Sequence, residues 1–199
     1  MQEHLLSSKQ MAQFVASGYL RLDDMVSKKL CDECVEEIRE RHFGYLNVGA
    51  PFEETWPKDT ALGTVFRLPK VKGLIHSLVG PEPLYDHHAA HLVKAGHTHG
   101  PDMHQDSVID FRDNYYDIQL SFFPTDTPDK MGGTFLIPGT HFRNVRTSEI
   151  TIYQHMRGKI WATCPAGTIY VWNTRVWHGA RSNHTDRDRY MYKLRLNPT

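Results

Sequence analysis

The sequence predicts a mainly β protein, an antiparallel jelly roll with helices in its N-terminal part, and two observations carry this prediction. From about residue 83 onward, the spacing of apolar residues changes from a helical period to the alternation of extended strands. The same part of the chain contains short runs rich in aromatic and β-branched residues, separated by Gly, Pro and Asp. These runs cover residues 84–94, 117–123, 134–137, 159–163, 168–172 and 189–196. Six short strands in this span are typical of a jelly roll.

The length and composition predict one domain over residues 1–199, because 40% apolar residues in 199 are enough for one core. We expect residues 1–80 to be a mostly helical cover and residues 83–199 to be the β core. The first helix should have Ser8 as its N-cap and end at Gly18. Its apolar stripe should consist of Met11, Phe14 and Val15. A short strand at residues 19–22 should follow.

The pair Cys31 and Cys34 lies in the next expected helix, which runs to about Arg41. A C-x-x-C pair can serve redox chemistry or contribute to a zinc site. Here the two cysteines recur at helical spacing on the apolar face of the segment, and no second C-x-x-C occurs. We therefore expect both to be small buried residues of an amphipathic helix.

The faces of two strands can be predicted from their alternation. In residues 117–123 the polar residues Gln119 and Ser121 share one side, so they line either a polar cavity or the solvent. In residues 189–196 the charged side consists of Arg189, Lys193 and Arg195. Three cations without partners do not fit inside a small barrel, so we expect only Arg189 to reach the interior, with the other two at the rim.

The overall charge gives no reason to expect a nucleic acid or a membrane surface as partner, since 23 basic residues balance 23 acidic ones. Residues 1–20 contain no continuous apolar run, which argues against a signal peptide and a transmembrane span. The three cysteines are too few for a disulfide framework. These observations favour a cytoplasmic protein.

A candidate metal site begins with the H-x-D segment His104-Gln105-Asp106. In an extended segment residues two apart point the same way, so His104 and Asp106 can bind one cation. The favoured second imidazole is His178. Two imidazoles and one carboxylate on one face of an octahedron leave three positions open, as in non-haem Fe(II) oxygenases.

The residues after His178 form a pattern of their own, in which Gly179 is followed by Asn183, Thr185 and, eleven residues after the histidine, Arg189. Residues 132–141, Gly-Gly-Thr-Phe-Leu-Ile-Pro-Gly-Thr-His, lie between the two ligand segments. Together these segments resemble the phytanoyl-CoA dioxygenase family. The matches extend over roughly the C-terminal half to two-thirds of the chain.

The resemblance implies a cupin-like double-stranded β-helix that uses Fe(II), 2-oxoglutarate and O2. It implies that His104, Asp106 and His178 are the iron ligands. It also implies that the guanidinium of Arg189 binds the distal carboxylate of 2-oxoglutarate, a task suited to its planar pair of donors. Arg187 lies on the same strand side, and the offset from His178 favours Arg189. We expect Gln105, Thr134, Gln119 and Ser121 to line the cosubstrate pocket.

The expected reaction is hydroxylation of a small-molecule substrate with release of succinate and CO2. Related halogenases lack the carboxylate ligand, whereas this chain retains Asp106, which disfavours halogenation. Two alternatives remain open from the sequence. One is a cupin-like metalloenzyme that does not use 2-oxoglutarate, and the other is a non-catalytic metal-binding or sensor protein.

Overall fold

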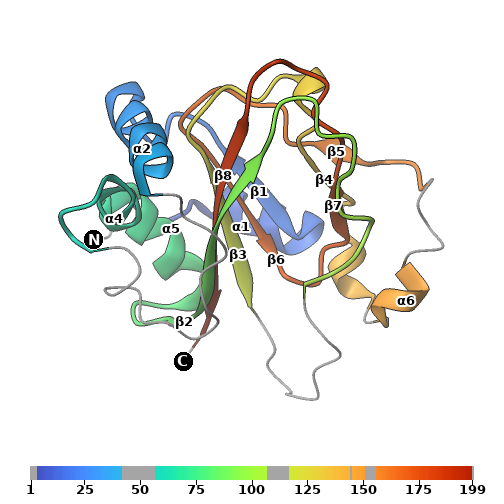
Figure 1. The fold of residues 1–199 in the computed structure, drawn as a ribbon. Helices are drawn as coiled ribbons and strands as arrows, with labels where there is room; N and C mark the ends of the chain where they lie inside the picture. The colour runs from blue at the N-terminus through green and yellow to red at the C-terminus, as the bar shows by residue number, and fades with distance from the viewer. Residues whose placement is uncertain (1–3, 42–56, 107–116, 144, 151–155, 199) are drawn as a thin grey trace.

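Two antiparallel sheets face each other at the centre of the fold, and helices cover the outer face of the larger sheet (Figure 1). The computed structural model describes residues 4–41, 57–106, 117–143, 145–150 and 156–198. Side chains from both sheets line one cavity between them, including Trp172 of the larger sheet and Thr134 of the smaller one. This arrangement is the predicted mainly β architecture with N-terminal helices.

The larger sheet has five strands in the order β1-β6-β3-β8-β2, and all its pairs are antiparallel. Its strands are β1 (Tyr19–Leu22), β2 (Leu84–Val93), β3 (Ile118–Phe123), β6 (Thr168–Asn173) and β8 (Arg189–Asn197). Each of these five strands was predicted from the sequence, with bounds that differ by a residue at most. Strands β3 and β8 have a partner strand on both edges, and all six residues of β3 are buried, so both of its faces are covered.

The smaller sheet has three strands in the order β5-β4-β7. Its strands are β4 (Thr134–Leu136), β5 (Ile160–Trp161) and β7 (His178–Ala180). The sequence predicts β4 and β5 but not β7. Strand β7 is too short to show alternation and contains Gly179, whose missing side chain leaves space for the ring of Phe135. Three short helical segments accompany this sheet, η2 (Asp129–Met131), η3 (Thr140–Phe142) and α6 (Thr147–Ile150).

Within the described residues, four helices come before β2, and their apolar faces pack on the outer face of the larger sheet. They are α1 (Ser8–Ser17), α2 (Lys28–Arg41), α4 (Ala61–Arg67) and α5 (Pro69–Val79). The residues of β3 and β8 that face these helices, among them Leu120, Tyr192 and Leu194, are fully buried. The burial of apolar area between helices and sheet is the main source of stability for this half of the molecule.

Helix α1 corrects two details of the sequence prediction. The N-cap is Ser7 rather than Ser8, and its side chain forms a reciprocal capping box with Gln10. Phe14 is buried as expected, but Val15 is 56% exposed and faces away from the core. Gly18 ends the helix in the left-handed conformation at φ 79°, as predicted.

Cys31 and Cys34 lie on the buried face of α2, which confirms the prediction of an amphipathic helix. Both are free thiols, as is the buried Cys164. Burial raises the pKa of Cys31 to about 11 and that of Cys164 to about 12, and it raises the pKa of Cys34 further still. These thiols are protonated at neutral pH and are poor nucleophiles and metal ligands.

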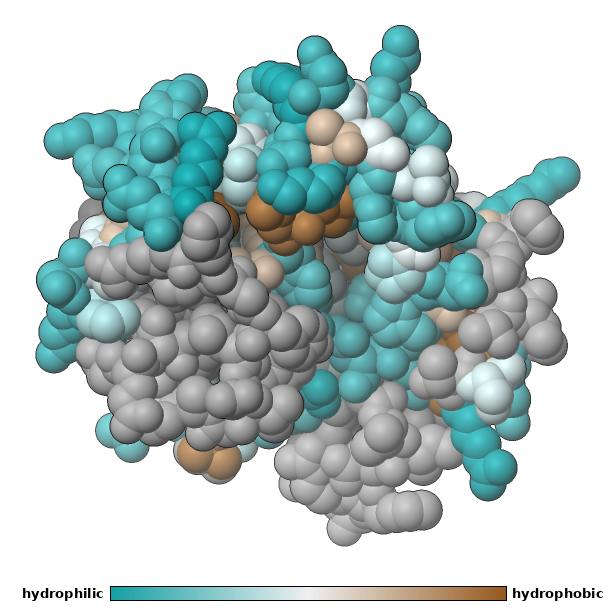
Figure 2. Space-filling view, viewed as in Figure 1, coloured by the Kyte–Doolittle hydropathy of each residue, from teal (hydrophilic) through white to brown (hydrophobic). Residues whose placement is uncertain are grey.

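The described part of the surface in Figure 2 is mainly hydrophilic, and hydrophobic residues show chiefly in a recess near the upper middle of the view. Among the described helices, none is both long and apolar enough to cross a membrane.

Candidate metal centre

The two histidines of the centre are brought together by their backbones. The amide of His104 donates to the carbonyl of His178, and the amide of His178 donates to the carbonyl of His104, both at 2.8 Å. This antiparallel bridge fixes the H-x-D segment to the start of β7. The two imidazole rings lie 4.4 Å apart, centroid to centroid, although 74 positions separate them in the chain.

Each imidazole is oriented by a backbone carbonyl. Nδ1 of His104 lies 2.6 Å from the carbonyl oxygen of Asp102, and Nδ1 of His178 lies 2.9 Å from that of Val176. A carbonyl oxygen only accepts hydrogen bonds, so Nδ1 carries the proton in both rings. When the ring is neutral, Nε2 therefore carries the lone pair, which is the state required of a metal ligand.

Both free nitrogens point at the carboxylate of Asp106. Nε2 of His104 is 3.6 Å from Oδ1, and Nε2 of His178 is 3.5 Å from Oδ2. The three potential ligand atoms lie within 4.8 Å of one another. Nitrogen and oxygen donors bind a transition-metal ion at about 2.0–2.2 Å, so one ion can reach all three with small adjustments. The donor set and its spacing fit a two-histidine, one-carboxylate site.

The charge state of the centre suits a cation. Burial opposes the ionisation of Asp106, but His178, His104 and Lys193 together hold the pKa of this carboxyl well below its usual range. The carboxylate is thus ionised at neutral pH. Burial also opposes protonation of His104, yet the hydrogen bonds with Asp106 and Asp102 raise its pKa above the usual value.

A cavity of about 120 Å³ lies beside these three residues, between the two sheets. Its lining includes Gln119, Thr134, Trp172, Arg189 and Lys193. The sequence left open whether the polar side of β3 lines a cavity or faces the solvent. In the structure Gln119 and Ser121 are both buried. Gln119 reaches the cavity, whereas Ser121 does not line it among the described residues.

Arg189 opens strand β8 with its side chain buried in this cavity. Its Nη1 donates to the carbonyl oxygens of Met131 and Gly132, and no described carboxylate lies within ion-pair distance of its guanidinium. Burial lowers the pKa of Arg189 to about 10, with a further contribution from Arg181. The residue is still a cation at neutral pH, and it lacks a counter-ion within the described structure.

The turn between His178 and Arg189 is held by Asn183. Its amide nitrogen donates to the carbonyl oxygens of Val93, Lys94 and Arg187. Its oxygen accepts from the backbone and the hydroxyl of Thr185. One fully buried side chain thus fixes the path of the chain, and with it the position of Arg189 relative to His178.

Of the two other residues predicted to line the cosubstrate pocket, Thr134 lies in the cavity lining and Gln105 does not. Thr134 lines the cavity, with its hydroxyl 3.9 Å from the sulfur of Met191. Gln105 is buried but is not part of the described lining, because its Nε2 donates to the carbonyl of Val145 at 2.7 Å. Gln105 therefore anchors the segment after η3 to the H-x-D segment.

Strand β8 contradicts one expectation from the sequence, since Lys193 and Arg195 do not emerge at the rim. Nζ of Lys193 lies 3.2 Å from Oδ2 of Asp106. Arg195 lies 3.7 Å from a carboxylate oxygen of Asp117, and its Nη1 donates to the backbone carbonyl of Asp106. Lys193 is buried and Arg195 is half-buried. Acidic partners from the H-x-D segment and from the start of β3 meet them there.

Sequence reasoning also missed Trp172, whose ring lies 5.5 Å from that of His178. The signal for both Lys193 and Trp172 is present in the sequence. Each occupies an inward position of a predicted strand, in phase with Arg189 or with the polar residues of β3.

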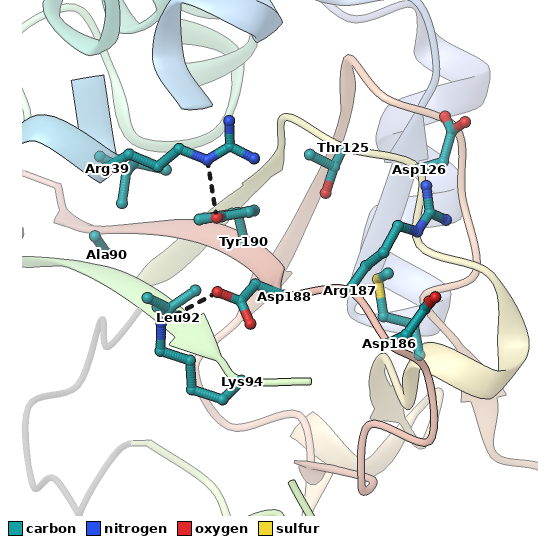
Figure 3. Close-up of a pocket in the computed structure, with 12 residues that line it drawn as sticks. Arg39, Ala90, Leu92, Lys94, Thr125, Asp126, Asp186, Arg187, Asp188 and Tyr190 are labelled. Atoms are coloured by element: carbon teal, nitrogen blue, oxygen red, sulfur yellow. Dashed lines mark hydrogen bonds and ion pairs between the residues drawn. The ribbon is translucent and has the colours of Figure 1, made fainter. Parts of the chain in front are cut away.

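A larger hollow of about 950 Å³ lies on the helix side of the sheet, at the edge of α2 (Figure 3). Arg39, Lys94 and Arg187 line it together with Asp126, Asp186 and Asp188. Arg39 contacts the hydroxyl of Tyr190, and Lys94 pairs with Asp188, so part of this charge is already neutralised. None of the three clustered ligand residues lines this hollow, so the smaller cavity is the candidate site.

The family model described as phytanoyl-CoA dioxygenase matches residues 14–191 of the chain. No curated protein sequence matches it. Several of the similar solved structures contain 2-oxoglutarate according to their descriptions, among them EctD and HygX. EctD from S. alaskensis, with 2-oxoglutarate and 5-hydroxyectoine, has 16% identity and a TM-score of 0.78, over 97% of this chain and 76% of that chain. HygX from Streptomyces hygroscopicus, with nickel and 2-oxoglutarate, has 12% identity and a TM-score of 0.75, over 98% and 88%.

A third similar structure is the α-ketoglutarate-dependent carbocyclase SnoK from nogalamycin biosynthesis. It has 17% identity and a TM-score of 0.76, over 96% of this chain and 84% of that chain. At these identities the likeness shows the fold, and it confirms the predicted fold class.

Proposed function

This chain belongs to the phytanoyl-CoA dioxygenase family, and on that premise we propose that it is an Fe(II)- and 2-oxoglutarate-dependent oxygenase that hydroxylates a small molecule. The observation that carries the proposal is the meeting of two Nε2 lone pairs and one ionised carboxylate beside a cavity that also holds the guanidinium of Arg189. The presence of 2-oxoglutarate in the similar EctD and HygX structures supports the proposal.

His104, Asp106 and His178 are the proposed ligands of Fe(II). When bound, the iron and 2-oxoglutarate supply the oxidation of a substrate C–H bond by O2, with succinate and CO2 as coproducts. The residues of the chain bind and orient these groups. Backbone carbonyls fix both imidazole tautomers, so the ligand nitrogens need no rearrangement when a metal enters.

Arg189 is the proposed anchor for the distal carboxylate of 2-oxoglutarate. It is buried and cationic, and no described carboxylate pairs with it, so a bound carboxylate would supply the missing counter-ion. Thr134 and Gln119 line the same cavity and are proposed to contact the cosubstrate. For Gln105 and Ser121, which do not reach the described lining, we propose no direct contact.

Hydroxylation is the proposed outcome because the carboxylate of Asp106 occupies the position that a halide would need. Two of the similar structures are described as a carbocyclase and an epimerase, so other outcomes are named for those proteins. The mass of the product distinguishes these outcomes, since hydroxylation adds one oxygen atom, ring closure removes two hydrogens and epimerisation leaves the mass unchanged.

The test begins with anaerobic titration of the protein with Fe(II) and then 2-oxoglutarate. We expect a weak charge-transfer absorption band that requires both additions and is absent from His178→Ala. After air is admitted, succinate should form in amounts that depend on iron. A protein that binds Fe(II) but gives neither the band nor succinate would instead be a metalloenzyme of another kind or a metal-binding protein.

A further inference from the structure

Lys193 is a second cation in the cavity lining. The proposed binding of iron and 2-oxoglutarate gives it no role. It lies on β8 four residues after Arg189, on the same side of the strand. At about 3.3 Å per residue, the two Cα positions are about 13 Å apart along the strand. The residue is only 7% exposed, and its Nζ contacts Oδ2 of Asp106 at 3.2 Å.

The charges of the cavity lining can be balanced group by group. Among the described lining residues, Asp106 is the one carboxylate, and Arg189 and Lys193 are the cations. Of the three lining histidines, His104 and His178 must be neutral to bind a metal, and His91 is counted here as neutral as well. A divalent ion takes up the charge of Asp106 and that of the keto acid end of 2-oxoglutarate, and Arg189 takes up the distal carboxylate. One positive charge, that of Lys193, then has no counter-ion.

A buried ammonium without a counter-ion is costly, so the loaded site favours a ligand with one negative charge. The position of this charge is also defined. It must lie near Nζ of Lys193 and Asp106, about 13 Å along β8 from Arg189.

Two further side chains of this cavity have unused hydrogen-bonding atoms. Nε1 of Trp172 and Oε1 of Gln119 are buried and have no hydrogen-bond partner, and the residues are 1% and 2% exposed. They are cross-strand neighbours on β6 and β3, and β3 also pairs with β8. Three adjacent strands therefore present an ammonium, an indole N–H and an amide oxygen to one cavity. The indole N–H and the amide oxygen have no hydrogen-bond partner, and the ammonium has one ionic partner, Asp106.

We propose that the substrate of this oxygenase is a small monoanion whose carboxylate pairs with Lys193 and accepts a hydrogen bond from the indole N–H of Trp172. Oε1 of Gln119 is an acceptor, so it is left for a donor group elsewhere on the substrate. This inference rests on the proposed function. A carboxylate is favoured over a phosphate because a single charge is left to balance. Lys193 then sets both the class of substrate and the distance of the bound molecule from the metal.

The test uses acetate as the probe and acetamide as its neutral isostere. The protein is loaded with Co(II), which is paramagnetic and does not turn over, and with 2-oxoglutarate. The relaxation of the probe methyl protons is then measured by NMR as the probe is titrated. We expect saturable acetate binding, no comparable effect with acetamide, and a loss of acetate affinity of about tenfold or more in Lys193→Met.

Lys193→Arg keeps the charge and should retain acetate binding within about threefold, since a guanidinium also pairs with a carboxylate. If Lys193→Met binds acetate as tightly as the wild type, or if acetamide binds equally well, the proposal is wrong. Unchanged acetate affinity in Lys193→Met is the result expected if acetate coordinates the metal directly instead of pairing with Lys193. Thermal unfolding of each variant reports whether it is folded.

Calorimetric binding of 2-oxoglutarate to the same Co(II)-loaded samples separates this inference from the proposed function. Lys193→Met should bind 2-oxoglutarate nearly as well as the wild type, because Arg189 is intact. A wild type that does not bind 2-oxoglutarate would overturn the proposed function, and the substrate inference with it. A wild type that binds 2-oxoglutarate but shows no Lys193-dependent acetate binding would overturn only the inference.

Discussion

Replacement of Arg189 by Met should remove most of the affinity for 2-oxoglutarate while leaving metal binding intact. Met keeps much of the length and apolar stem of the side chain but has no charge and no donor. The side chain of Arg189 is buried in the cavity, and its guanidinium has only two backbone carbonyls as described partners. The loss of its charge therefore unpairs no described carboxylate.

The expected magnitude follows from the geometry of a guanidinium and a carboxylate. Hydrogen bonds to charged groups contribute about 1.5–3 kcal/mol. At 1.4 kcal/mol for each factor of ten, the dissociation constant should rise roughly 10- to 150-fold. Burial strengthens the interaction because water competes less well for the carboxylate. Arg189→Lys should fall between the wild type and the Met variant, since it keeps the charge but not the two parallel donors.

The assay is calorimetric titration of 2-oxoglutarate into Co(II)-loaded protein, with Co(II) affinity measured separately. Arg187→Met is the matched control, because Arg187 lies two residues earlier, is exposed and does not line the cavity. It should bind 2-oxoglutarate like the wild type. If Arg187→Met loses affinity and Arg189→Met does not, the assignment taken from the offset to His178 is wrong.

Three other predictions concern metal binding, thiol reactivity and stability. His178→Ala should lower Co(II) affinity by more than about 100-fold, which exceeds the loss expected for a residue that only orients a ligand. The control His97→Ala replaces an exposed histidine and should leave Co(II) affinity unchanged. Equal Co(II) affinities of the two variants in the titration would show that His178 is not a ligand. Because burial raises the pKa of Cys31 to about 11, only about one thiol in a thousand is ionised at pH 8; mass spectrometry should therefore find Cys31 unalkylated by iodoacetamide until urea unfolds the chain, and rapid native labelling would contradict this. Phe14→Ala should cost about 3–5 kcal/mol in urea unfolding, while the neighbouring exposed Val15→Ala should stay within about 0.5 kcal/mol; similar losses for both would show that α1 is packed in another orientation.

The parts of the fold that sequence could predict are those with a long periodic signal. Strands β2 and β8 have ten and nine residues, and the sequence predicts both; the alternation of β8 also gives its two faces. Strand β7 has three residues, two of them small, so alternation cannot reveal it. It pairs with β4 and, through His178, with His104, and no local pattern encodes these distant partners.

The same distinction explains the exposed Val15. Met11, Phe14 and Val15 lie within one helical turn of each other, and periodicity alone allows either Met11 with Phe14 or Met11 with Val15 to face the core. The choice depends on how α1 packs against the rest of the molecule, and burial settles it for Phe14. A ten-residue helix with a weak apolar stripe leaves this rotation undetermined in the sequence.

The wrong placement of Lys193 and Arg195 has a different cause. The alternation of β8 put them correctly on the inner side, and the expectation that they leave the interior came from a charge argument in which they had no partners. That argument failed because both partners are distant in the chain: Asp106 for Lys193 and Asp117 for Arg195. Strand periodicity therefore gave the correct face, and only the tertiary structure could supply the counter-ions. For a strand in which several cations share the inner face, the physical conclusion is that acidic groups or anionic ligands must meet them inside. In this protein Asp117 meets one cation, and the other two, Arg189 and Lys193, face the cavity in which the cosubstrate and substrate are proposed to bind.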